Sequence, residues 1–301
     1  MVSLFCKIST YIFTNTLCHQ VIIVRKRPPL SFSQLLVCIG LLCALTGGLT
    51  LIASHASPDK RFEQVTSRLF RNEMASSTLN MHYTIADPKT FGISEYEPVL
   101  PIYHSGQPED SKEHCSDLLH RLDRIDPDRL SPENAYTYRL LHRSLENDLA
   151  LADFPYYNEP LSPSSGMQSQ LPVLLAEYTF RTKRDVTDYL ALLDQIDDYF
   201  ASLLLYEQEK AAAGFFMPAC SSEKVRKQCD TIVTTEELTQ GTHFLQTTFE
   251  DRLSELQKQG LFTPEETASL IETNDRLLAT VVQPAYAALS EGLHSLETSP
   301  N

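Results

Sequence analysis

The stretch FPYYNEPLSPSSGMQSQLPVLLAEYTF, residues 154–180, interrupts a chain that otherwise follows a helical pattern. Its four prolines fix φ, remove backbone donors and push the preceding residues away from the α region. Its aromatic and leucine side chains distinguish it from a polar, flexible linker. We therefore predict that this proline-rich stretch is an ordered, extended loop between two helical blocks. Long ordered loops in compact domains are often functional.

Amphipathic helices are predicted on both sides of the proline-rich stretch, because apolar residues recur there at spacings of three, four and seven. The expected helices cover roughly residues 59–74, 113–125, 132–152, 185–210, 223–233, 234–259 and 264–296, and residues 76–102 are expected to be looped and packed along helices. Pro284 is expected to kink the last helix. The sequence thus predicts a mostly-α, multi-helix domain with a proline-rich extended loop.

Helix-start signals support several of these boundaries. Ser131 precedes Pro132 and Thr263 precedes Pro264, which is the preferred order of N-cap and first helical residue. Thr234, with a glutamate three residues later, has the pattern of a capping box for a helix that runs to about residue 259. Asp185 is expected to cap a single long helix that ends near residue 210.

An apolar segment at residues 35–53, LLVCIGLLCALTGGLTLIA, carries no charge and follows three consecutive basic residues at 25–27. Its length lies between that of a signal-peptide core and that of a membrane span, which needs roughly 20 apolar residues. Basic residues before such a segment place the N-terminus in the cytoplasm. We expect a cytoplasmic or unstructured segment (1–34), a signal anchor or transmembrane helix (35–54) that contacts the membrane, and an extracytoplasmic helical domain (57–301). Cleavage after residues 54–56, which would release a secreted protein, is the alternative.

The charge distribution argues against one class of partner. The chain has 25 basic and 39 acidic residues. Residues 1–56 contain four of the basic residues and none of the acidic ones. The remainder therefore carries a formal charge of −18. Nucleic-acid-binding domains require the opposite sign, so no nucleic-acid partner is expected.

No catalytic or metal-ligating set is recognisable in the sequence. The nine histidines form no HExxH pattern, and neither a GxSxG elbow nor a GxxxxGK[ST] phosphate loop occurs. We therefore assign no catalytic residue, no metal ligand and no cofactor. Cys220 and Cys229 could pair as a disulfide in an oxidising compartment, and free thiols are the alternative.

Polar residues beside the apolar part of the proline-rich stretch are the candidates for lining a cleft that takes a peptide-like substrate. These candidate cleft-wall residues are Tyr157, Glu159, Gln168, Glu177, Tyr178 and Arg181. The alternative is that such groups satisfy backbone atoms left unpaired by the prolines.

Three stretches, residues 70–93 (FRNEMASSTLNMHYTIADPKTFGI), 154–180 and 185–218, resemble in the same order the amino-terminal half of the bacterial "domain of unknown function 885" family. The resemblance covers roughly residues 59–296, and the EPLSP–G–Q–QLPVLLAEY block is its most specific part. It implies a helical, exported or lipid-anchored protein similar to zinc-dependent peptidases.

In this family an HExxxH-like metal motif and a downstream glutamate lie in the carboxy-terminal half. Those positions would follow residue 301, so no ligand or catalytic residue can be carried over to this chain. The resemblance implies zinc for full-length family members only. We expect a truncated chain that is inactive alone, or a stand-alone membrane-anchored module that binds peptides or cell-wall material.

Overall fold

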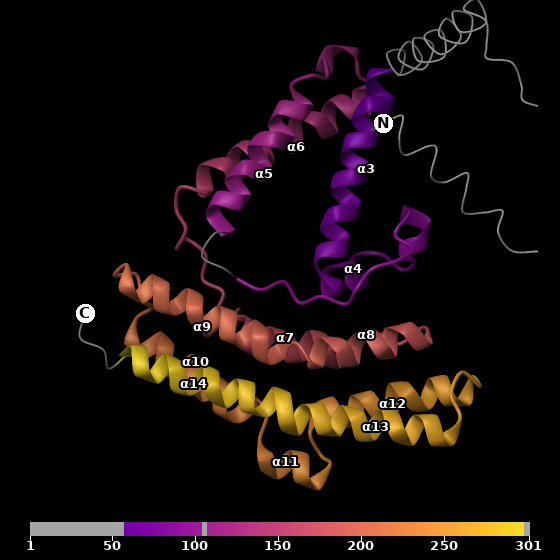
Figure 1. Cartoon of the computed structure of the whole chain (residues 1–301), viewed down its shortest axis with the longest axis vertical. Helices are drawn as coiled ribbons and strands as arrows, with labels where there is room; N and C mark the ends of the chain where they lie inside the picture. Colours follow the sequence, from indigo (N-terminus) through magenta and orange to yellow (C-terminus); the bar gives the residue numbers. More distant parts are fainter. Residues whose placement is uncertain (1–56, 104–106, 298–301) are drawn as a thin grey trace, which may run out of the picture. The chain divides into compact units, whose positions relative to one another are not determined.

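The computed structural model describes residues 57–103 and 107–297, which fall within one compact unit, Ser57–Asn301. These residues form helices joined by loops and contain no strand, which confirms the predicted mostly-α class (Figure 1). The α-helices are α3 Pro58–Ser76, α4 Thr78–Thr84, α5 Gln107–Leu122, α6 Pro132–Leu151, α7 Met167–Ala176, α8 Lys183–Leu193, α9 Ile196–Ala212, α10 Ala219–Ile232, α11 Thr235–Gln240, α12 Phe244–Lys258, α13 Pro264–Leu277 and α14 Gln283–Glu297. Two 3₁₀ turns, η1 Pro88–Phe91 and η2 Pro127–Arg129, and a π-helical segment, η3 Leu278–Val282, complete the order.

Several helices start at the N-cap residues that the sequence predicts. The Ser131 hydroxyl accepts the amide of Asn134 at the start of α6. Thr263 and Glu266 form a reciprocal capping box at the start of α13. These contacts satisfy backbone donors that have no partner inside the helix.

The helix predicted over residues 185–210 is in fact two helices, α8 and α9, separated at Asp194 and Gln195. Thr182 is the N-cap of α8, and Asp185 is its third helical residue, so the predicted cap was wrong by three residues. At the break, the Gln195 side chain donates to the Pro98 carbonyl and accepts the Leu100 amide, both at 3.0 Å. The apolar period continues through the break because both helices face the same core.

The helix predicted over residues 234–259 is also two helices. The Thr234 hydroxyl accepts the Glu237 amide as expected, but α11 ends after six residues at Gly241, whose φ is +67°. The left-handed conformation of Gly241 closes the helix. His243 then caps α12, since its ring nitrogen accepts the Leu245 amide.

The proline-rich stretch is non-helical over residues 154–166, which include turns and bends, and over residues 177–180. Between them, residues 167–176 form α7 around Pro172. A proline inside a helix cannot donate to the carbonyl four residues earlier, which here belongs to Gln168. The Tyr286 hydroxyl of α14 donates to that carbonyl at 2.8 Å instead. The prediction of an extended loop was therefore wrong for residues 167–176, because a tertiary contact compensates for the proline.

Gly166 lies where the first non-helical part of the proline-rich stretch meets α7. Its amide donates to the Ser162 carbonyl, and a Cβ at this position would lie 2.3 Å from the Ser162 nitrogen. Only glycine fits this turn without moving backbone.

The disruption expected at Pro284 takes the form of one π-helical segment, η3. The Gln283 amide donates to the carbonyl of Leu278, five residues earlier. Pro284 itself has no amide hydrogen to continue the α-helical pattern. The backbone hydrogen bonds therefore change from the α-helical to the π-helical spacing immediately before it.

Buried apolar side chains form three groups. The largest group lies among the helices from α7 through α14. The main packed helix pairs there are α10 with α14, α9 with α14, and α12 with α13. The second lies among α3, α5 and α6 and comprises Phe62, Cys115, Leu118, Leu122, Ile125, Tyr138 and Leu145. The third comprises Met74, Met81, Ile85 and Ile93.

The segment at residues 76–102, predicted to be looped, contains the short helix α4 and the turn η1 in its first part, so the prediction was wrong for residues 78–84. From Ile93 onward the segment has no helix and packs along other helices, as the sequence predicts. Tyr96 donates its hydroxyl to Asp188 of α8 at 2.7 Å, and the Tyr103 amide donates to Ser202 of α9 at 3.1 Å. These contacts hold this part of the chain against α8 and α9.

Within the described ranges, no helix is both long and apolar enough to cross a bilayer. The predicted segments 1–34 and 35–54 lie outside the residues that the structure describes.

Candidate functional site

An open groove of about 460 Å³ lies where the start of the proline-rich stretch meets α5, α6 and α9. Five aromatic residues, Tyr103, Phe154, Tyr156, Tyr157 and Tyr206, and the acidic residues Asp148 and Glu209 are among its lining residues. We call this surface the aromatic groove. It contains Tyr157, one of the six candidate cleft-wall residues.

Tyr206 of α9 holds the proline-rich stretch against the groove. Its hydroxyl donates to the carbonyls of Pro155 at 3.1 Å and Asn158 at 2.9 Å. Its ring centroid lies 5.4 Å from that of Tyr103 and 6.0 Å from that of Tyr156. Burial raises the pKa of Tyr206, so the hydroxyl remains protonated and able to donate. These two carbonyls of the proline-rich stretch thus receive their hydrogen-bond donor from α9.

Aromatic side chains at the edge of the aromatic groove are unusually exposed. Phe154 is 64% exposed and Tyr157 is 70% exposed. Phe215, which follows α9, is 61% exposed and lies 6.1 Å from the Tyr156 ring. Adjacent exposed aromatic rings on a soluble domain mark an interaction surface more often than single exposed residues do.

The aromatic groove has the chemistry of a binding site. Asp148 and Glu209 supply negative charge, and the rings supply apolar faces. Cys115 also lines it, but burial and the neighbouring Asp148 carboxylate raise the pKa of this thiol. A protonated, buried thiol is a poor nucleophile. The lining residues therefore fit recognition of a ligand better than attack on one.

Glu159 lies on the same stretch but takes part in an ion pair. Its Oε2 atom lies 2.6 Å from Nζ of Lys210, a lysine that is only 1% exposed. Glu207, one turn earlier on α9, is 0% exposed, and both its carboxylate oxygens are buried without a hydrogen bond. Burial raises the pKa of Glu207 to about 7, although Lys210 opposes this shift. We call the buried residues Glu207 and Lys210, together with the exposed Glu159 that pairs with Lys210, the buried charge cluster.

Tyr178 and Arg181 lie elsewhere, beside His82 of α4. The His82 ring stacks on the Tyr178 ring at 3.6 Å between centroids, and its Nε2 atom accepts the Thr179 amide at 3.1 Å. Burial, with a smaller contribution from Arg181, lowers the pKa of His82 to about 4. The imidazole is therefore neutral at pH 7 and serves as a hydrogen-bond acceptor for the backbone.

Glu177 is exposed, whereas Gln168 is fully buried and structural. The Gln168 side chain donates to the Ser162 carbonyl at 2.6 Å and to Gln228 of α10 at 2.8 Å. The six candidate cleft-wall residues thus do not converge on one cavity. Tyr157 lines the aromatic groove, Glu159 belongs to the buried charge cluster, and Tyr178 and Arg181 surround His82.

The disulfide considered between Cys220 and Cys229 is not formed, and both residues are free thiols on α10. Nine residues of helix separate them by roughly 13 Å along the axis, which exceeds the distance of about 7 Å that a disulfide can bridge. Within the described residues, no group of three or more His, Cys, Asp or Glu side chains could hold a metal ion.

The described fold is that of an all-α domain with a surface groove. The family model described as "Bacterial protein of unknown function (DUF885)" matches residues 89–299, and the chain belongs to this family. This finding confirms the family assignment made from the sequence. No curated protein sequence gives a significant match.

Among solved structures, the chain is similar to a protein of Colwellia psychrerythraea described as a "putative lipoprotein". The match has a TM-score of 0.62 and 15% sequence identity, and it covers 80% of this chain and 41% of that chain. At this identity the match shows the fold alone. The chain spans about two fifths of the length of that protein.

Proposed function

We propose that this chain is an extracytoplasmic helical domain that binds an extended peptide in the aromatic groove. The apolar segment at residues 35–54 would anchor it to the membrane, with the N-terminus in the cytoplasm, or would be removed to release a secreted form. The lipoprotein description of the Colwellia protein supports an extracytoplasmic location.

One observation carries this proposal: exposed aromatic rings and two carboxylates line the same groove. Its volume of about 460 Å³ is within the range of small-molecule and side-chain sites, roughly 300–1,000 Å³. A lysine or arginine side chain can place its cation over an aromatic face, which contributes about 0.5–1 kcal/mol at an exposed site. Asp148 and Glu209 would attract the same cation. The preferred ligand is therefore a peptide with a basic side chain.

Calorimetric titration of the full chain in neutral detergent tests the proposal. The probes are acetylated, amidated pentapeptides of alanine with a central Lys, Arg, norleucine or Glu. We expect Lys and Arg peptides to bind more tightly than norleucine, and the Glu peptide to bind most weakly. Equal affinity for all four peptides would refute the assigned role of the carboxylates.

Two variants and two matched controls assign any binding to the aromatic groove. Tyr157→Ala and Glu209→Gln should each weaken binding of the Lys peptide roughly two- to fivefold. Tyr136→Ala removes a tyrosine of similar exposure from α6, and Glu272→Gln removes an exposed acid from α13. These controls should have no effect. If cell-wall glycan fragments bind in a Tyr157-dependent manner and the peptides do not, the ligand is a glycan and the peptide proposal is wrong.

A second candidate function follows from the family resemblance and from the partial coverage of the Colwellia protein. In that proposal, the chain forms one wall of a zinc-dependent, peptidase-like hydrolase and is inactive alone. Sequencing the gene beyond the codon for Asn301 tests it. An HExxxH-type helix in the same reading frame would support the hydrolase, and its absence would leave the binding function alone.

A further inference from the structure

A small cavity of about 30 Å³ lies between α4 and the start of α8. His82 of α4 and Asp185 of α8 line it, together with Thr78, Tyr96 and Arg181 among others. Its volume equals the share of one molecule in liquid water, roughly 30 Å³, and is far below the roughly 300 Å³ of small organic-ligand pockets. We call this space the His82 cavity. Its size suits a single water molecule.

The hydrogen bonds of His82 decide which ring nitrogen carries its proton. The Nε2 atom accepts the Thr179 amide at 3.1 Å, so this nitrogen presents a lone pair. Burial lowers the pKa of His82 to about 4, so the ring is neutral at pH 7 and has one N–H group. The proton therefore lies on Nδ1, the nitrogen nearer to Asp185.

The Nδ1–H group of His82 cannot reach Asp185 directly. Its nitrogen lies 3.9 Å from Oδ1 of Asp185, whereas an N–H···O hydrogen bond is about 2.7–3.2 Å long. The observed distance lies between the length of one such bond and that of two in series. Because a buried donor without an acceptor is costly, a bridging molecule is favoured here.

Asp185 offers an acceptor to the same space. Its Oδ2 atom accepts the amides of Arg181 at 2.9 Å and Thr182 at 2.7 Å, as well as the Thr182 hydroxyl at 3.0 Å. The donors at the start of α8 thus bind Oδ2, which leaves Oδ1 on the side of His82. The bridging molecule must accept from Nδ1–H and donate to Oδ1. Water does both.

Two further polar groups line the His82 cavity. The Thr78 hydroxyl accepts the Val99 amide at 2.8 Å, so its own proton can be donated elsewhere. The Tyr96 hydroxyl donates to Asp188 at 2.7 Å, so its oxygen can accept. Buried waters in proteins make about three hydrogen bonds, and these groups supply the remaining partners. A cation is disfavoured, because the guanidinium of Arg181 lines the same space.

We propose that the His82 cavity binds one structural water, which accepts from Nδ1–H of His82 and donates to Oδ1 of Asp185. This water connects α4 to the start of α8. It therefore joins the third group of buried apolar side chains, which includes Met81 of α4, to the largest group. The site is independent of peptide binding in the aromatic groove.

A crystal structure of the full chain tests the water directly. We expect one ordered water within hydrogen-bond distance of both Nδ1 of His82 and Oδ1 of Asp185. A direct hydrogen bond between these two atoms would overturn the proposal. So would a His82 cavity without an ordered water in a structure that shows ordered waters at other buried polar groups.

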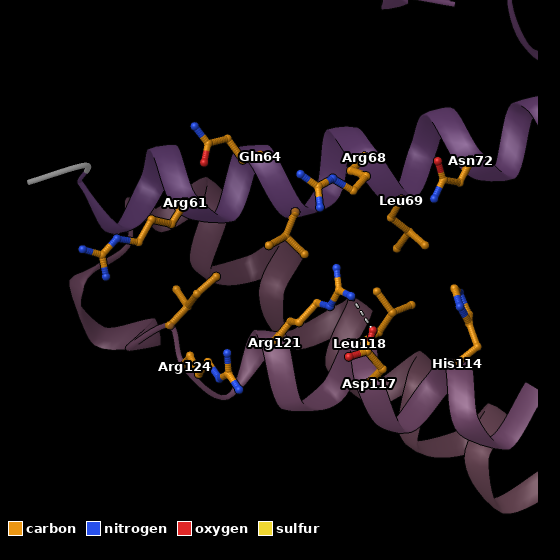
Figure 2. A pocket seen from close by; sticks show the side chains of 12 residues that line it. Arg61, Gln64, Arg68, Leu69, Asn72, His114, Asp117, Leu118, Arg121 and Arg124 are labelled. Carbon is orange, nitrogen blue, oxygen red and sulfur yellow. Dashed lines mark ion pairs between the residues drawn. The ribbon is translucent and has the colours of Figure 1, made fainter. Parts of the chain in front are cut away.

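Nuclear magnetic resonance of the full chain in neutral detergent, labelled with ¹⁵N-histidine, tests the tautomer. We expect His82 to carry its proton on Nδ1, and this N–H signal to persist at pH 7 and to show a nuclear Overhauser effect to a bound water. His114 is the internal control, since it is exposed on α5 and lines the open groove between α3 and α5 that Figure 2 shows. Its N–H signal should be lost through exchange with solvent. A proton on Nε2 of His82 would refute the bridge.

One variant removes the acceptor of the bridge. Asp185→Asn can still accept the amides of Arg181 and Thr182, but it replaces the second oxygen by an amide group, so the His82 N–H signal should be lost through faster exchange. Glu237→Gln changes the acid at the equivalent third position of α11 and should leave the signal intact. Both variants should keep the helical circular dichroism of the wild type. A persistent signal in folded Asp185→Asn would contradict the assigned acceptor, and if this variant does not fold, the wild-type tautomer and crystal structure still decide.

Discussion

Glu207→Gln provides a sharp test of the buried charge cluster. Glutamine has nearly the same shape as protonated glutamic acid and is neutral at every pH. In the wild type, the Glu207 carboxyl has a pKa of about 7 against 4.5 in an unfolded chain, because burial disfavours its charged form. The folded state therefore holds a proton more tightly than the unfolded state between these two values. Over that range, stability falls as the pH rises.

The size of this effect follows from the shift. A difference of about 2.5 pKa units corresponds to about 3 kcal/mol, at 1.36 kcal/mol for each unit. Glu207 is fully buried, so solvent screening does not reduce this value. The penalty is absent below pH 4.5 and complete above about pH 7. In Glu207→Gln it should disappear.

His82 has the opposite effect on stability, which rises with pH because of this residue. Its pKa is lowered from 6.5 to about 4, so the unfolded chain binds the proton more tightly between these values. The stability linked to His82 is present above pH 6.5 and is lost as the pH falls toward 4. Its size is also about 3 kcal/mol. In the wild type, the change of stability with pH that is due to Glu207 and the change that is due to His82 nearly cancel between pH 4.5 and 6.5.

Urea unfolding of the full chain in neutral detergent, followed by far-ultraviolet circular dichroism at pH 5 and pH 8, measures both contributions. Because pH 5 already lies above 4.5, the stability difference between the two pH values should change by about 2.5 kcal/mol from wild type to Glu207→Gln, in favour of pH 8. His82→Gln should shift the same difference in the opposite direction. Acids whose pKa is lowered, such as Asp59 and Glu266, titrate alike in all variants and cancel in the comparison. Parallel pH profiles for wild type and Glu207→Gln would refute the account of the buried carboxyl.

The packing of the proline-rich stretch leads to further predictions. Tyr286→Phe leaves the buried Gln168 carbonyl without its donor and should lower the free energy of unfolding by about 1–3 kcal/mol, whereas Tyr136→Phe on the surface should change it negligibly. Gly166→Ala should cost about 3 kcal/mol, since its Cβ would overlap backbone. Gly292→Ala should cost less, because the Cβ would meet only the flexible Leu204 side chain. Both pairs can be compared by urea unfolding, and an inverted order in either pair would contradict the structure.

The parts of the fold that depend on local chemistry were predictable from the sequence. Ser131 and Thr263 cap their helices because the hydroxyl, the following proline and the nearby amides lie within four residues of one another. The break between α8 and α9 was not predictable, because it depends on Gln195 bonding to a segment 95 to 97 residues earlier. Periodicity cannot show such a partner.

The same limit applies to the candidate site. The aromatic run in the proline-rich stretch marked Tyr157, which does line the aromatic groove. Tyr206 and Asp148 come from helices on either side of that stretch, and nothing in their local sequence distinguishes them from ordinary helical residues. Gln168 looked like a cleft residue from its polar character, but its partners lie on α10 and in a turn. Only the tertiary structure separates these roles.

The bond between Tyr286 and the Gln168 carbonyl has a consequence for the order of folding. The two residues are 118 positions apart, and a ribosome needs roughly 6 to 24 s to synthesise that length at 5–20 residues per second. Until α14 emerges, α7 contains a proline with no compensating donor and is poorly stabilised. The proline-rich stretch should therefore remain open during synthesis and become ordered last. Such a delay would keep the nascent chain unfolded for longer, which the extracytoplasmic location proposed above would require of a chain that crosses the membrane.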